Sequence, residues 1–227
     1  MIKNNKFLVL FLCSVLCMIS VFSVTVNVSA ATEKSDGRNM KKVLYYYGKK
    51  EYKTARKYNK KISKVAKESC VANMTPRIKK AYKNVVNRYK LFDVNLSSQK
   101  HIWAYYLTDI DNDRKVDLLV KAGSCEADVK LYIYQYKNGK AKKIGAVDAF
   151  HTYYYAYPNH KGILGYGGMM GKEWIRLITV SNGKLKEKQI GSRGIKKHWF
   201  NLRCELNGHI SYNDYTEEYE VDYKDLL

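Results

Sequence analysis

The chain has 227 residues, a formal net charge of +20 and five cysteines. Only Cys70, Cys125 and Cys204 lie beyond the first 30 residues, so at most one disulfide can form and a disulfide scaffold is excluded. The 197 residues that follow are enough for one domain with a buried core, or for a small helical piece and a β domain.

The first 30 residues have the three-part layout of a secretory signal peptide. Lys3 and Lys6 form a short basic region, an apolar run occupies residues 7–26, and Val28-Ser29-Ala30 supplies small residues for cleavage. The run is long enough to span a membrane, but its small-residue ending favours cleavage over a retained anchor. We therefore expect a secreted protein, extracellular or associated with the cell wall, that begins at Ala31.

Residues 31–92 are predicted to form a basic helical segment. Apolar and small side chains recur there at alternating spacings of three and four, which marks one face of a helix. They are Ala55, Tyr58, Ile62, Val65 and Ser69 in the first helix, and Ile78, Ala81, Tyr82, Val85 and Tyr89 in the second. Thr75-Pro76 is typical of a helix start. We expect a helical hairpin whose apolar faces pack against the sheet that follows.

Most of the excess positive charge lies on this segment, which has 19 Lys and Arg against four Asp and Glu. Lys57, Lys60, Lys61 and Lys64 largely avoid the apolar stripe, and we assign them to contact with an anionic wall polymer or membrane surface. The alternative is that the lysines only solvate helix faces. Because the chain is predicted to be exported, no nucleic acid partner is expected.

Residues 93–227 are predicted to form an antiparallel β domain. Aromatic and β-branched residues dominate, and Asn138-Gly139, Asn182-Gly183 and Asn207-Gly208 favour tight hairpin turns. Residues 132–145 are similar to residues 176–191, which is an internal repeat of 44 residues and close to a propeller-blade period. The fold class is α+β, with a helical hairpin followed by a curved antiparallel sheet, open or partly closed, made of propeller-blade-like hairpins. We expect residues 165–172 to form a glycine-rich bend between strands.

The most informative motif is an aspartate-rich loop between two predicted strands. Its carboxylates occupy positions 1, 3, 5 and 9, and position 7 can offer a backbone carbonyl, which is the spacing by which a loop surrounds Ca²⁺. The predicted ligands are Asp109, Asp111, Asp113, Lys115 and Asp117. The alternative is an aspartate-rich turn that binds no metal. No glutamate stands at position 12, so an EF-hand is not expected.

Residues 107–120 resemble the calcium loop of FG-GAP/VCBS repeats, which reads Asp-x-Asp-x-Asp-Gly-x-x-Asp-Leu between two strands. Residues 123–128, 134–140 and 167–171 are weakly similar to exported, poorly characterised proteins of Gram-positive gut bacteria, and the resemblance as a whole covers roughly residues 100–192. The resemblance implies calcium at the same five residues. Arg114 replaces the glycine at position 6, and a positive φ there costs a non-glycine residue roughly 1–2 kcal/mol, so we expect weakened calcium affinity.

Cys125 allows two further hypotheses. It could pair with Cys204 in a disulfide, or both could be free thiols in the core. With His151 it could also form an extracellular thiol hydrolase, although the adjacent Glu126 and Asp128 disfavour a thiolate. We favour a non-enzymatic, exported, calcium-binding structural or binding module, and the sequence does not predict its oligomeric state.

Overall fold

The computed structural model describes residues 31–64, 66, 74–89, 101–195, 199–206 and 208. The predicted signal peptide, Cys70 and the third Asn-Gly turn lie outside the described residues, so those predictions stay untested. In the part of the chain that is described, no helix is both long and apolar enough to cross a membrane.

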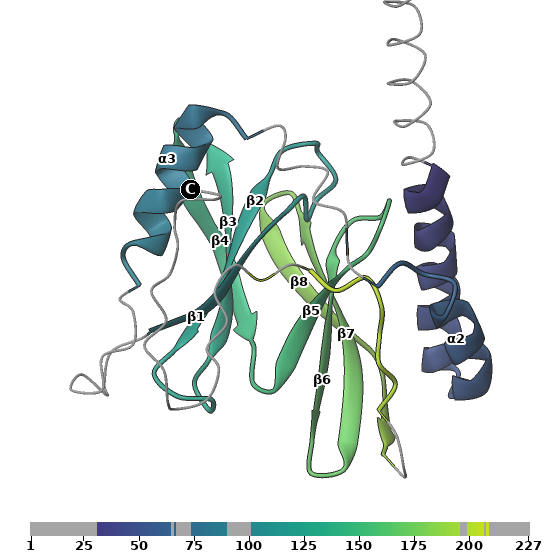
Figure 1. Ribbon diagram of the computed structural model, residues 1–227. Coiled ribbons are helices and arrows are strands. Elements are labelled where there is room, and N and C mark those ends of the chain that lie inside the picture. The colour runs from purple at the N-terminus through teal and green to yellow at the C-terminus, as the bar shows by residue number, and fades with distance from the viewer. Residues whose placement is uncertain are drawn as a thin grey trace, which may run out of the picture.

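The described residues form helices on the N-terminal side and two open four-stranded antiparallel sheets, which confirms the α+β class (Figure 1). The strands are divided between two sheets, β1-β2-β3-β4 and β5-β6-β7-β8, where one curved sheet was expected. Residues 31–48 are helical. The other elements are α2 (Tyr52–Asn59), α3 (Pro76–Val86), β1 (His101–Thr108), β2 (Asp117–Gly123), β3 (Lys130–Lys137), β4 (Lys140–Asp148), β5 (Thr152–Ala156), β6 (Ile163–Met169), β7 (Lys172–Ser181) and β8 (Lys184–Gly194).

Three apolar cores join these elements into four layers. The central core lies between the two sheets and contains side chains such as Leu119 and Ile133 from the first and Ile178 from the second. The outer face of the first sheet packs against α3, and the outer face of the second packs against the helix of residues 31–48 and α2. Each sheet is therefore covered on both faces, and successive residues of β2 alternate between two cores.

The described helices do not form the predicted helical hairpin on one sheet. The helix of residues 31–48 and α2 lie on one side of the molecule and α3 lies on the other, with both sheets between them (Figure 1). Each helix packs on the sheet face nearest to it, as the apolar stripes predicted, but the two faces belong to different sheets. α2 ends at Asn59, before Ile62. The Asn59 side chain donates to the Asn201 carbonyl and accepts from the Arg203 amide, which ties this end of the helix to the segment after β8.

The 44-residue repeat corresponds to equivalent hairpins in the two sheets. Asn138-Gly139 joins β3 to β4 and Asn182-Gly183 joins β7 to β8, and all four residues have positive φ, as tight hairpin turns require. Each returning strand also carries a bulge at an Ile-Gly pair, because Ile144 and Ile190 are skipped in the strand register. The repeated sequence therefore encodes the same bulged hairpin twice.

The predicted glycine-rich bend over residues 165–172 is shorter than expected. Gly165, Gly167 and Gly168 lie within β6, and the turn to β7 is formed by Met170 and Gly171, both at positive φ. A Cβ at Gly168 would clash with the ring of Trp199. A Cβ at Gly167 would lie 2.7 Å from the ring of Trp174. These glycines let tryptophan rings lie directly on the strand.

Candidate metal centre

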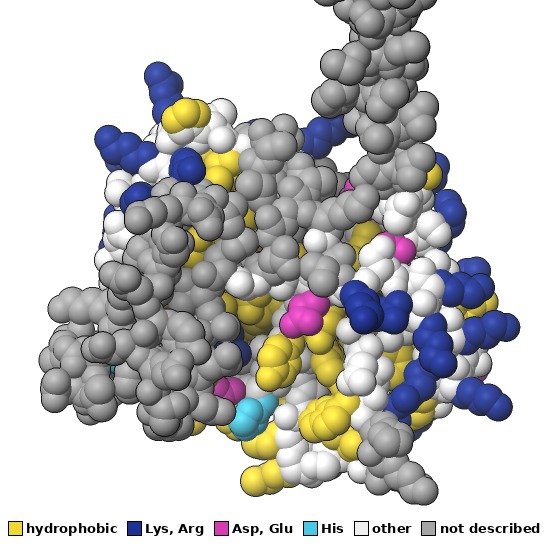
Figure 2. All heavy atoms as spheres, in the orientation of Figure 1, with side chains coloured by type: hydrophobic (Ala, Val, Ile, Leu, Met, Phe, Trp, Pro, Cys, Tyr) yellow, Lys and Arg dark blue, Asp and Glu magenta, His cyan; other side chains and the backbone are white. Residues whose placement is uncertain are grey.

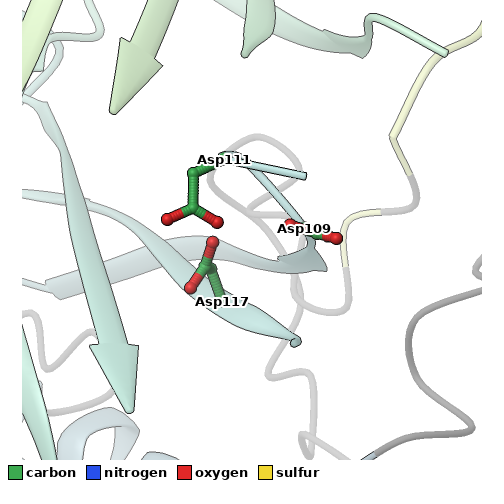
Figure 3. Close-up of side chains that lie close together, drawn as sticks. All are labelled: Asp109, Asp111 and Asp117. Carbon is green, nitrogen blue, oxygen red and sulfur yellow. The ribbon is translucent and has the colours of Figure 1, made fainter. Parts of the chain in front are cut away.

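The predicted calcium loop connects β1 to β2. Asp109 directly follows β1, and Asp117 is the first residue of β2. Between them the backbone reverses through Asn112 and Arg114, which have φ angles of 58° and 67°. This path brings the side chains of Asp109, Asp111 and Asp117 together, and Figure 3 shows the carboxylates of Asp111 and Asp117 facing each other with Asp109 beside them.

These three carboxylates form the acidic cluster. One oxygen from each lies within 4.8 Å of the other two. Asp117 is 2% exposed, and burial together with the neighbouring Asp111 raises its pKa to about 8. Burial also raises the pKa of Asp109, against the opposing effect of hydrogen bonds from the amides of Arg114 and Asp113. The fold thus holds close together carboxyl groups that repel each other when ionised, which a bound cation would relieve.

Gln135 on β3 also belongs to this site. The pairing of Leu118 with Tyr134 places Gln135 next to Asp117 across the β2–β3 ladder. The Gln135 amide nitrogen donates to Asp111 Oδ2 at 2.8 Å. Gln135 Oε1 and Asp111 Oδ1 are buried and accept no hydrogen bond within the described residues. Sequence reasoning missed Gln135 because only the strand register brings it to the loop.

Asp113 does not join the acidic cluster. Its carboxylate accepts hydrogen bonds from the Lys115 amide at 2.8 Å and from Lys115 Nζ at 3.1 Å. Both side chains of this pair are well exposed. The hydrogen bond that the Lys115 ammonium donates to the Asp113 carboxylate raises the pKa of Lys115. Of the four predicted carboxylate ligands, the structure therefore brings three together and directs the fourth toward Lys115.

Arg114 has the positive φ that its place in the loop predicted. Its amide donates to Asp109 Oδ2 at 2.7 Å, so the loop's own hydrogen bonds hold this conformation. The unfavourable φ of Arg114 therefore lowers the stability of the folded protein whether or not calcium is bound. We expect replacement of Arg114 to change the free energy of unfolding more than the calcium affinity.

Arg114→Gly is accordingly expected to stabilise the folded protein by about 0.5–1 kcal/mol. Glycine removes roughly 1–2 kcal/mol of left-handed strain but adds about 0.4–1 kcal/mol of unfolded-state entropy. Urea unfolding in the presence of a chelator measures the difference. A loss of stability would show that contacts of the arginine side chain outweigh the backbone strain.

The four lysines assigned to surface contact are all exposed. Lys57 lies on α2, whereas Lys60, Lys61 and Lys64 lie in the segment after it, because α2 is shorter than predicted. The ammonium of Lys61 lies over the ring of Tyr58, 5.7 Å from its centroid. The structure thus keeps the lysines at the surface but does not arrange them along one helix.

The predicted cysteine sites have different surroundings. Cys125 is exposed and Cys204 is buried, and they are not bonded to each other, so the disulfide alternative is wrong. Burial raises the pKa of the Cys204 thiol to about 12, as expected of a core thiol. His151 pairs with Glu126 at 3.3 Å, and no hydrogen bond within the described residues joins it to Cys125. This geometry lends the hydrolase hypothesis no support.

Comparison with protein-family models, curated proteins and solved structures finds no match to this chain. The resemblance to FG-GAP/VCBS loops therefore stays a prediction, and functional reasoning rests on the site itself.

Proposed function

We propose that this protein is an exported, calcium-binding structural module whose metal joins the β1–β2 loop to the sheet. The observation that carries the proposal is the convergence of Asp109, Asp111 and the buried Asp117. Asp109 and Asp111 belong to the loop, whereas Asp117 is anchored in β2 and accepts from the Ile110 amide at 3.0 Å. A cation held by all three would fix the loop against the sheet.

The donor set favours a hard divalent cation. Every side chain in the cluster offers oxygen, with no histidine or cysteine among them. Ca²⁺ accepts six to eight oxygens in flexible geometry, whereas Mg²⁺ demands near-ideal octahedral geometry. An irregular loop with carboxylates at unequal depths suits Ca²⁺ better. The amide oxygen of Gln135 supplies a further oxygen donor after rotation of the amide.

Calcium is expected to raise the melting temperature of the protein that begins at Ala31. Binding to the folded state alone stabilises it by about 2.7 kcal/mol at a hundredfold excess over the dissociation constant. Asp111→Ala should abolish this gain, whereas Asp113→Ala, the matched control, should retain most of it because Asp113 pairs with Lys115. Differential scanning calorimetry with calcium or chelator measures the effect.

Two outcomes would contradict the calcium proposal. The first is a parent whose melting temperature is unchanged in millimolar calcium, and the second is an Asp111→Ala variant that responds to calcium as strongly as the parent. Loss of the response in Asp113→Ala would instead show that the loop recruits all four predicted carboxylates.

We further propose contact with an anionic cell surface, supported by the exposed lysines of the N-terminal helices. Lys and Arg side chains gather over these helices at the right of the molecule (Figure 2). The chain contains 12 Lys and Arg against three Asp and Glu in residues 31–64, of which Asp36 is buried. Salt-sensitive binding of the purified protein to isolated wall fragments tests this contact.

A further inference from the structure

A row of five basic side chains and one tyrosine runs along the outer face of the helix of residues 31–48 and continues to the residue after it. We name this row the basic stripe. Its members are spaced by three, four or one residues, so all lie within about 100° of one another around the helix. They are Lys34, Arg38, Lys41, Lys42, Tyr45 and Lys49, and all are exposed.

The opposite face of the same helix is fully occupied. Met40, Val43, Leu44 and Tyr47 are at most 7% exposed, and they pack against the outer face of the second sheet. The helix also approaches β8 closely, because a Cβ at Gly48 would lie 3.1 Å from the Ile190 carbonyl oxygen. The sheet therefore fixes the rotation of the helix and directs the basic stripe to solvent.

The stripe is linear and carries five positive charges. From Lys34 to Lys49 it spans about 22 Å at 1.5 Å per residue, with cationic groups or Tyr45 at each successive turn. None of the ion pairs between described residues involves a stripe side chain. Positive charges spaced along a helix complement a linear polyanion better than they complement a single compact anion.

Aromatic rings join the stripe to α2. Tyr46 stacks on Tyr58 with ring centroids 5.6 Å apart and an interplanar angle of 3°. The ammonium groups of Lys42 and Lys61 lie 4.8 Å and 5.7 Å from the centroid of Tyr58. Cation–π contacts restrict these two lysines and lower the entropy cost of binding an anion. Tyr45, which is 59% exposed, offers a ring to the uncharged part of a ligand.

We propose that the basic stripe is the binding site for a linear polyol-phosphate polymer of the cell wall. This proposal rests on the surface contact proposed above and adds its location and its partner. Because its apolar face is packed on the sheet, the helix cannot insert that face into a bilayer, so a lipid surface would be bound by charge alone. The predicted export argues for a wall polymer over nucleic acid, although both carry phosphodiesters.

The test compares three variants of the protein that begins at Ala31, each lacking four positive charges. The stripe variant combines Lys34→Gln, Arg38→Gln, Lys41→Gln and Lys49→Gln. The segment variant combines Lys57→Gln, Lys60→Gln, Lys61→Gln and Lys64→Gln. The control variant removes exposed lysines from the two equivalent hairpins, with Lys137→Gln, Lys140→Gln, Lys184→Gln and Lys186→Gln. Circular dichroism and melting temperature confirm that each variant folds.

Binding is measured by fluorescence anisotropy with labelled poly(glycerol phosphate), an oligodeoxynucleotide of equal phosphate number, and vesicles containing phosphatidylglycerol. Five phosphate contacts predict that affinity for the polymer falls roughly 100-fold between 50 and 200 mM salt. The stripe variant should lose at least tenfold in affinity for poly(glycerol phosphate), and its salt slope should fall by about 3. The control variant should bind as the parent does.

The possible outcomes separate the stripe from the broader surface proposal. If the parent binds none of the probes, surface contact itself is wrong. If the segment variant weakens binding while the stripe variant does not, surface contact stands and the stripe is overturned. Equal losses of affinity in the stripe and control variants would mean that only net charge matters, which also overturns the stripe as the binding site. Tighter binding to the oligonucleotide or the vesicles would overturn the assigned partner.

Discussion

Replacing Arg193 with methionine is expected to destabilise the protein by about 3–5 kcal/mol, because it leaves the buried carboxylate of Glu173 without its cationic partner. Glu173 on β7 is 0% exposed and forms an ion pair with Arg193 on β8. Tyr166 donates to the same carboxylate at 2.6 Å, and the Phe200 amide donates to it at 2.9 Å. Urea unfolding at neutral pH measures the loss.

Two variants isolate the cause of that loss. Glu173→Gln combined with Arg193→Met removes both charges but keeps an oxygen that accepts from Tyr166, so it should be more stable than Arg193→Met alone. Lys130→Met breaks an exposed ion pair with Asp148 and should cost no more than about 1 kcal/mol. If the double variant is as unstable as the single one, an unpaired buried charge is not the reason.

Without calcium, the protein is expected to lose stability as pH rises through the ionisation of Asp117. The folded pKa is raised from 3.8 to about 8, so between these values the folded state binds a proton that the unfolded state has released. Stability from this group is therefore fully present below about pH 4 and lost by about pH 8. At about 1.4 kcal/mol per pKa unit, the total change in the free energy of unfolding is on the order of 6 kcal/mol.

Asp117→Asn should remove this pH dependence and make the protein more stable than the parent at pH 8 in the presence of a chelator. The asparagine oxygen can still accept from the Ile110 amide. Saturating calcium should reverse the order, because the ion stabilises the ionised parent and not the variant. Unfolding curves at pH 5, 6.5 and 8 measure both effects. A parent whose chelated stability is unchanged across this range would contradict a raised pKa at Asp117.

The buried Glu173 could not have been recognised from the sequence. It follows the Met170-Gly171 turn and precedes Trp174, in a stretch rich in glycine and charge. Its partners are distant in the chain: Tyr47 lies in the N-terminal helix and Phe200 follows β8. A carboxylate is tolerated there because four elements converge on it with donors, and such convergence leaves no trace in local spacing.

The sequence alone determined the elements whose cause is local. Asn-Gly pairs form the β3–β4 and β7–β8 turns because those residues tolerate positive φ, and Thr75-Pro76 begins α3 through its capping hydroxyl. The aspartate loop likewise lies between two strands, as its spacing predicted. Only the tertiary structure decided the other features. The strands divide between two sheets, and Gln135 lies beside Asp111. Asp113 pairs with Lys115, and the basic stripe faces solvent. Strand register and helix rotation are set by packing between residues far apart in the chain, so these features follow from burial and not from local pattern.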